Sequence, residues 1–525
     1  MTSCLINLRK AKCLLYTLLF FFALLSASPH MSLSLFSLPP LISFPLKPLR
    51  SACSPVLHSV SLSLYVIFNW KSNHIFEGEM ESSADKEMVE TVQRSFVAPN
   101  EETPKERLWL SNLDLVMRPD CYTPIIYLYV PPEGKCNADV EEFFSVTTIE
   151  KALAIALVPF YPLAGRFGTD GDGRREIDCN GEGALFVVAR SKLTRHHFDD
   201  FKPSTKNRNL FVPVVDSNSA VHQLPPLMLQ MTYLSCGSVV LGLAFNHSVV
   251  DAHSDFHFMQ ALTNIAKGNS SIVPAPYINR TLIRARSPPL SPSKRQAYAA
   301  GTKSESLGHT SKEISPPVVS TILKLSQCQI NCLKSQRSSN KSTDSAAVST
   351  FQAVSAHIWK VFCVARGLAH DKESRLIFSI GIRSRILPPL PEYFFGNGVT
   401  STVATATVSE VIGFIPERIR EAIGQVDDAY IRAHIDDLEV ADKDRVRNSN
   451  RMTESDILIA SWLGMPCYDA DFGYGKPVLV SRAETGMTGV AVLINNPGKD
   501  KGISVAIELE EETMELFKNA FYDFN

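Results

Sequence analysis

The chain has 525 residues, a formal net charge of −2 and 45% hydrophobic residues, a composition typical of a globular protein. Basic residues are not in excess, so we expect no nucleic-acid partner, because phosphate binding needs clustered Lys and Arg. The 11 cysteines are odd in number and have no repeated spacing, so neither a disulfide framework nor a metal site is predicted.

The first 79 residues differ from the rest of the chain in composition and in the pattern of their apolar residues. Arg9, Lys10 and Lys12 precede an apolar run of about a dozen residues, which is the pattern of a secretory signal. The run is shorter than the roughly 20 residues that a membrane-spanning helix needs. Two interpretations stay open: residues 1–79 are a signal-like segment, or they are a spurious extension and the physiological chain starts at Met80.

The location of the protein is inferred from its cysteines and from one glycosylation pattern. The triplet "NHS" at Asn246 would place a glycan beside His247, and scattered thiols suit a reducing compartment. We therefore expect a cytoplasmic protein without stable membrane insertion. The alternative is the secretory pathway, if residues 1–27 act as a signal.

Residues 80–283 alternate between strand-like and helix-like segments. Strands are predicted where aromatic and β-branched residues run together, and helices where apolar residues recur every three or four positions. In chain order we expect a strand at 123–131, a helix at 147–160 that stops at Pro159, strands within 182–190 and 227–245, and a helix at 254–268.

Residues 284–317 are rich in Ser, Pro and Lys and poor in large apolar residues, which indicates a crossover linker. The second half repeats the mixed texture, with helices expected at 349–366 and 409–425 and strands at 375–382, 478–481, 489–495 and 502–509. The sequence thus predicts an α/β fold with two similar mixed-sheet domains, residues 80–283 and 318–525.

A polar cluster follows the short apolar run Val239–Phe245, which is typical of a buried strand. It holds His247, Asp251, His253 and Asp255. A neutral imidazole, whose usual pKa is about 6.5, can take a proton from an alcohol or amine near neutral pH. Spacing alone also allows four ordinary polar residues, and we expect His253 and Asp255 to be bystanders.

Other chemistries lack their motifs. No G-x-S-x-G elbow for a serine nucleophile is present, and no H-E-x-x-H for a zinc protease. The glycine-rich run "GTDGDG" at 168–173 has the wrong spacing for a dinucleotide fingerprint and is predicted to be a hairpin turn.

Two motifs in order carry a family resemblance. "HSVVD" at 247–251 and "DFGYG" at 471–475 resemble the H-x-x-x-D and D-F-G-W-G motifs of the BAHD family of acyl-CoA-dependent acyltransferases. The resemblance runs from about residue 95 to the end and is strongest to the hydroxycinnamoyl-CoA:shikimate/quinate branch. Further similar blocks are "LWLSNLDLV" (108–116), "YTPIIYLY" (122–129), "LVPFYPLAGR" (157–166), "EIDCNGEG" (176–183), "PYINRTLIRARSPP" (276–289) and "RSRILPPLPEYFFGNG" (383–398).

The resemblance implies a monomer of two domains with a channel between them. Acyl-CoA would enter as co-substrate from one face and a small alcohol or amine from the other, with no cofactor and no metal. His247 would be the general base, and Asp251 would point away from the substrate and pair with Arg383. In the second motif, Asp471, Gly473 and Gly475 would shape a structural loop.

Several positions depart from the family pattern. Asn246 and Ala252 replace a His and a Gly of the first motif, and Tyr474 replaces the Trp of the second. At the position of Leu387, the shikimate-using branch looks to carry an arginine that binds the acceptor's carboxylate. An apolar side chain cannot supply that contact.

The departures shape the expected substrates. We expect an amine or a neutral or phenolic alcohol as acceptor, with Thr123 and Tyr127 lining its pocket and a hydroxycinnamoyl group as the acyl part. The alternative that stays open is a non-catalytic small-molecule-binding protein on the same fold. Because His247 and Asp251 are both retained, the enzyme is the favoured hypothesis.

Overall fold

The structure is a computed structural model that describes residues 88–132, 143–215, 219–269, 274–290, 317–336, 347–440, 452–498 and 501–524. The predictions for residues 1–79 and for most of the linker 284–317 lie outside the described residues. Within these ranges, no helix has both the length and the apolar character needed to cross a membrane.

Six strands of the described part form the first sheet, in the order β1-β6-β7-β8-β3-β13. Pairing is antiparallel except between β6 and β7, which are parallel. The strands are β1 (Glu90–Val97), β6 (Ala184–Ser191), β7 (Leu227–Leu234), β8 (Val239–Asn246), β3 (Tyr122–Tyr129) and β13 (Leu479–Arg482).

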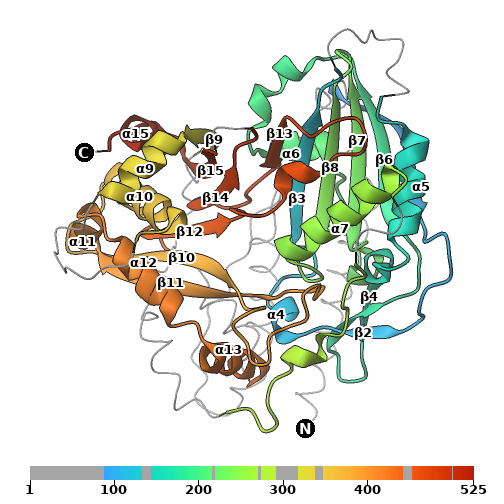
Figure 1. Cartoon of the computed structure of the whole chain (residues 1–525), viewed down its shortest axis with the longest axis horizontal. Coiled ribbons are helices and arrows are strands. Elements are labelled where there is room, and N and C mark those ends of the chain that lie inside the picture. Colours follow the sequence, from blue (N-terminus) through green and yellow to red (C-terminus); the bar gives the residue numbers. More distant parts are fainter. Residues whose placement is uncertain are drawn as a thin grey trace, which may run out of the picture. The chain divides into compact units, whose positions relative to one another are not determined.

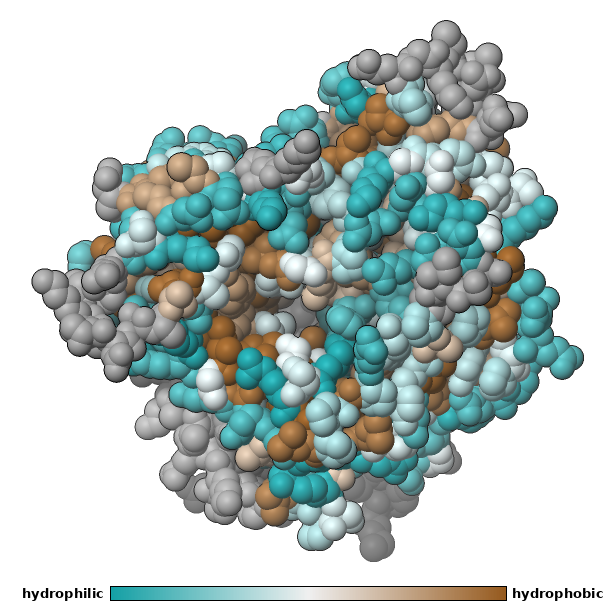
Figure 2. Space-filling view, in the orientation of Figure 1, coloured by the Kyte–Doolittle hydropathy of each residue, from teal (hydrophilic) through white to brown (hydrophobic). Residues whose placement is uncertain are grey.

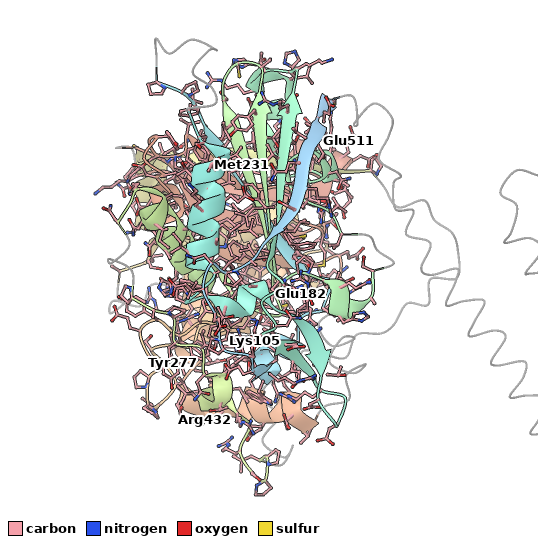
Figure 3. All side chains as sticks on the ribbon, turned by 90° about the vertical axis from the view of Figure 1, so that its right-hand side faces the viewer. Lys105, Glu182, Met231, Tyr277, Arg432 and Glu511 are labelled. Atoms are coloured by element: carbon pink, nitrogen blue, oxygen red, sulfur yellow. The ribbon has the colours of Figure 1, made fainter. Side chains whose placement is uncertain are left out.

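Helices α5 (Val146–Ala156) and α7 (Ala252–Ala266) pack against each other and run alongside this sheet (Figure 1). β7 and β8 are buried along their whole length, which explains why their sequences are nearly continuous apolar runs rather than alternating ones. Met231 of β7, labelled in Figure 3, is fully buried in the apolar core between the sheet and the helices.

The second sheet has the order β11-β10-β12-β14-β15-β9 within the described ranges, and it is also mixed. β12 pairs in parallel with both of its neighbours, β10 and β14, and the other pairs are antiparallel. The strands are β9 (Val318–Leu325), β10 (Glu373–Gly381), β11 (Val399–Thr407), β12 (Asp456–Ser461), β14 (Val490–Asn495) and β15 (Ile503–Glu510). Helices α9 (Gln327–Ser335), α10 (Thr350–Ala365) and α15 (Glu511–Phe521) cover it, with α10 the most buried of them.

The two halves of the chain share a strand. β13 comes from the second half of the sequence but pairs with β3 at the edge of the first sheet, where its dark red lies beside the blue of β3 in Figure 1. Apolar residues of the second half, among them Trp462, Phe472 and Val480, also belong to the first core. The first half therefore does not complete its core without residues 462–482.

A smaller sheet of β2 (Arg107–Trp109), β5 (Arg175–Asp178) and β4 (Arg166–Thr169) lies in the first half. The glycine-rich run 168–173 covers the end of β4 and the hairpin turn to β5, as predicted. Gly173 has a φ of +76°, which a glycine adopts without strain.

The helix predicted at 409–425 is wrong as a single element. The structure has two helices, α11 (Val408–Ile412) and α12 (Pro416–Gly424). Pro416 has no N–H to continue α11 and disfavours helical backbone in the residue before it, so the chain turns at Gly413–Ile415 and starts a new helix at the proline. Several further elements had not been predicted: β1, β9, β11, β12 and α13 (Asp428–Val440).

Candidate active site

His247 lies in the short loop between the end of β8 and the start of α7. Its backbone N–H donates to the carbonyl of Cys121 at 2.8 Å, so the loop begins as a continuation of the β3–β8 pairing. The side-chain amide of Asn246 donates to the carbonyl of Pro119 at 2.7 Å, and its oxygen accepts from the N–H of Ser248 at 2.9 Å. Asn246, a departure from the family pattern, therefore has a structural role in fixing the loop.

Asp251 closes the loop and pairs with Arg383 of the second half, as expected from the resemblance. Two N–H groups of the guanidinium meet the two carboxylate oxygens at 2.7 and 2.9 Å. Asp251 also accepts from the N–H of Ser254, as the N-cap of α7, and from the N–H of Gly398. Burial alone would raise the pKa of Asp251, but Arg383 and these backbone donors outweigh it, so the pKa lies below its ordinary value and the group stays ionised.

Arg383 is also clamped by the chain that follows it. It donates to the carbonyls of Phe394 and Gly396, both at 3.2 Å. A Cβ atom at Gly398 would lie 2.6 Å from a guanidinium nitrogen of Arg383, so only glycine fits there. The segment 383–398 therefore wraps around the ion pair and buries most of it: the side chains of Arg383 and Asp251 are 15% and 2% exposed.

A second tether holds His247 from its carbonyl side. The side-chain amide of Asn397 donates one hydrogen to the His247 carbonyl and one to Asp114 Oδ1, both at 2.8 Å. Asp114 belongs to α4 (Asn112–Leu115) and forms an ion pair at 3.2 Å with Arg280, and both of these side chains are fully buried. Asn397, Asp114 and Arg280 were not predicted as site residues, although each lies in one of the blocks that carry the resemblance.

The His247 side chain is buried, and its surroundings lower its pKa. Nδ1 is buried and has no partner of good hydrogen-bond geometry in the described part of the chain. Burial lowers the pKa of His247, and the positive charge of Arg482 lowers it further, against the opposing effects of its own carbonyl and of Asp251. The imidazole is therefore neutral at neutral pH and able to accept a proton.

The predicted pocket residues divide into two groups. Thr123 and Tyr127 of β3 are buried, and alternation along the strand places both on the face of the sheet that α7 covers. Leu387 is 63% exposed, and the guanidinium of Arg432 donates to its carbonyl. The structure brings Thr123 close to the His247 loop, because it pairs with Phe245, two residues earlier. His253 is exposed on the first turn of α7.

The second motif forms a tight loop. Asp471 Oδ1 accepts from the N–H groups of Gly473 at 2.8 Å and Gly475 at 3.0 Å. Both glycines have positive φ, +95° and +100°, which side chains rarely adopt. Tyr474 packs against Phe144 at 5.3 Å between ring centroids, so the aromatic ring at this position anchors the loop to the first core.

A polar pocket of about 380 Å³ lies along the outer side of α7, and it does not include any predicted site residue. It is lined by His257, Gln260, Thr263, Asn264, Pro274, Tyr393 and Asp469.

Figure 2 shows one face of the molecule, where apolar residues gather near the centre and hydrophilic ones surround them. Within the described ranges, no group of three or more His, Cys, Asp or Glu side chains could hold a metal ion.

Comparison with known proteins places these features in a family. The profile of the Transferase family matches residues 87–524. Shikimate O-hydroxycinnamoyltransferase of Nicotiana tabacum is 36% identical over 444 residues, covering 83% of this chain and 100% of the relative. Putrescine hydroxycinnamoyltransferase 1 of Oryza sativa subsp. japonica is 36% identical over 460 residues, covering 83% of this chain and 99% of the relative.

Solved structures agree on the fold. Vinorine synthase has a TM-score of 0.61 at 22% identity, covering 82% of this chain and 96% of that one. The complex of F. sporotrichioides TRI101 with coenzyme A and T-2 has a TM-score of 0.65 at 19% identity, covering 79% and 97%. The predicted α/β architecture with two mixed sheets is confirmed, and the chain belongs to the Transferase family, the BAHD acyltransferases that its two motifs resemble.

Proposed function

We propose that His247 is the general base of this acyl-CoA-dependent acyltransferase, which moves a hydroxycinnamoyl group from coenzyme A to an amine or a neutral or phenolic alcohol. The observation that carries the proposal is the His247 loop, whose imidazole is neutral and whose backbone is held from both halves of the chain. Family membership and the retained His247–Asp251 motif favour an enzyme over the non-catalytic binding protein.

The reaction needs one proton acceptor and no covalent enzyme intermediate. Neutral His247 removes the proton of the acceptor's hydroxyl or amine as that group attacks the thioester carbonyl carbon. The tetrahedral intermediate then collapses, the C–S bond breaks, and the imidazolium returns the proton to the departing thiolate of coenzyme A. Asp251 takes no direct part in the proton transfer, because its oxygens accept hydrogen bonds from Arg383, Ser254 and Gly398. Its role is to position the His247 loop.

The acceptor is proposed from Leu387 and from one of the named relatives, the putrescine enzyme. The names of the relatives include putrescine, which has no carboxylate, and shikimate and 5-hydroxyanthranilate, which each carry one. Exposed Leu387 offers no charge for a carboxylate, and nearby Arg432 is engaged by Asp428 and by the Leu387 carbonyl. We therefore propose an acceptor without a carboxylate, bound near Thr123 and Tyr127.

The same proposal covers the organisation of the enzyme. Residues 80–283 and 318–525 are the two acyltransferase domains, residues 284–317 are the crossover linker, and residues 1–79 are a signal-like segment or a spurious extension. The pair of Asp251 and Arg383, one from each half, supports a substrate channel at this junction. The protein acts as a monomer in the cytoplasm.

Replacing the base tests the proposal directly. With p-coumaroyl-CoA and a panel of putrescine, agmatine, tyramine, aliphatic alcohols, shikimate and quinate, we expect acceptor-dependent release of coenzyme A thiol. His247→Ala should lower kcat by about 10²–10⁴-fold without unfolding the protein. His253→Ala, an exposed histidine six residues later, is the matched control and should keep its activity.

Unchanged turnover in His247→Ala would rule out the proposed base. Release with shikimate or quinate alone would contradict the argument from Leu387. A wild-type chain that releases no coenzyme A with any acceptor, or with a second acyl-CoA, would leave the non-catalytic protein as the better hypothesis.

The pH profile of kcat/KM should report the lowered pKa of His247. A base with a lowered pKa stays neutral to lower pH, so activity should be flat through neutrality and fall only below pH 6.5. Arg482→Gln removes a positive charge that lowers this pKa, so it should move the acid limb toward higher pH. Arg432→Gln serves as the control and should leave the limb in place; a limb unmoved by Arg482→Gln would show that Arg482 does not act on the base.

Asn397→Ala removes the two donors that tie His247 to Asp114. We expect kcat to fall by about 10–100-fold while the KM for acyl-CoA changes little, because the base is displaced and the donor site is not. The matched control is Asn207→Ala, another buried asparagine whose side-chain amide donates to the backbone at Lys202. Both variants should lose roughly 1–3 kcal/mol of stability; an equal loss of kcat in both would contradict the positioning role.

A further inference from the structure

Two pockets adjoin each other on the outer side of α7. The polar pocket of about 380 Å³ and a second pocket of about 220 Å³ are both lined by Asn264 and Pro274. The ring of Phe160, in the second pocket, contacts the ring of His257, in the polar one, edge to face at 5.1 Å between centroids. Neither pocket includes His247 or any other residue predicted for the active site, so together they form a separate site.

The polar pocket offers hydrogen-bonding groups that the protein leaves unused. His257, Gln260 and Asn264 are spaced by three and four residues, so they share one face of α7. Nε2 of His257 lies 3.0 Å from the carbonyl of Pro274 and therefore carries the ring proton. Burial lowers the pKa of His257, so the ring is neutral and its Nδ1 is an acceptor. Within the described residues, neither this nitrogen nor the side-chain amides of Gln260 and Asn264 have a hydrogen-bond partner.

The second pocket, called the apolar pocket, lies where α5 and α7 end side by side (Figure 1). Ile155 is 39% exposed there, so part of its apolar surface faces water. A ring or short chain of a ligand would be removed from water against this surface. The apolar lining residues are Ile155, Val158, Pro159, Phe160, Ala261 and Ile265, and the polar ones at its margin include Asn100, Glu101 and Asn269.

The charges of the lining favour a neutral ligand. No Lys or Arg lines either pocket, so a phosphate or a carboxylate finds no cation here, and the polyanion coenzyme A is not expected to bind. The two carboxylates also give a cation little: Asp469 already pairs with Lys476 at 2.7 Å, and Glu101 is exposed to water.

Sugar hydroxyls match the unused groups of the polar pocket, because each hydroxyl both donates and accepts. Tyr393, whose ring lies 5.1 Å from that of His257, adds an aromatic surface for the apolar face of a sugar ring. We propose that the two pockets bind a neutral glycoside of an aromatic alcohol, with the sugar in the polar pocket and the aromatic ring in the apolar pocket against Ile155 and Phe160. This site is additional to the proposed acyl transfer and does not depend on it.

Phenyl β-D-glucopyranoside is the probe, and its binding to the full chain is measured by ligand-observed NMR titration beside methyl β-D-glucopyranoside. We expect the phenyl glucoside to bind about 10-fold more tightly, because its ring leaves water. Gln260→Ala and Asn264→Ala should weaken the binding of both compounds by about 3–10-fold through lost hydrogen bonds. Ile155→Asn should remove the preference for the phenyl compound and leave the binding of the methyl glucoside unchanged.

The matched controls are Gln425→Ala and Val364→Asn. Both residues are exposed and line neither pocket, and Val364 is 48% exposed on a helix, as Ile155 is at 39%. Both control variants should bind the two glucosides as the wild-type chain does. The melting temperature of each variant verifies that it is folded.

A wild-type chain that does not bind the phenyl glucoside at millimolar concentration would overturn the site, as would binding that Gln260→Ala, Asn264→Ala and Ile155→Asn leave unchanged. Displacement of the probe by coenzyme A or by putrescine would also overturn it, because the probe would then occupy the active site or a cation site. Binding that persists in His247→Ala supports a separate site. The glycoside site and the proposed acyl transfer can therefore fail independently.

Discussion

The ion pair between Asp251 and Arg383 is the interaction on which the site depends. Asp251 is 2% exposed and joins three parts of the molecule: it caps α7, accepts from the backbone at Gly398 and receives the guanidinium of Arg383. Removing one member would leave the other charge buried and unpaired, which is strongly destabilising. A single carboxylate thus fixes the His247 loop relative to the second half of the chain.

The two tethers act on opposite ends of the His247 loop. Asp251 holds its end at α7, and Asn397 holds the carbonyl of His247 itself while reaching Asp114 in the first half. Asn397 and Gly398 are neighbours, so one short segment of the second half serves both tethers. An imidazole held in this way needs little rearrangement to meet its substrate, which is how positioning contributes to rate.

The sequence predicted the parts of the site that are local. His247 and Asp251 lie within five residues, between a recognisable strand and helix, and the second motif is also a short run. It could not predict the contact of Asn397 with Asp114, 283 residues away, nor the addition of β13 to the first sheet, because such pairings depend on the whole fold. Asp255 was expected to be a bystander, and its burial on α7, at 1% exposed, could not be read from its spacing to His247.

A double-mutant cycle on Asp251→Asn and Arg383→Gln tests the central ion pair most directly, with kcat/KM and melting temperature measured for each variant. We expect each single change to impair both quantities and the double variant to be no worse than the poorer single one, because the pair acts as a unit. The exposed pair of Glu410 and Arg418 is the control and should show almost no coupling. Independent, multiplicative effects at Asp251 and Arg383 would contradict a structure in which this ion pair holds the catalytic loop.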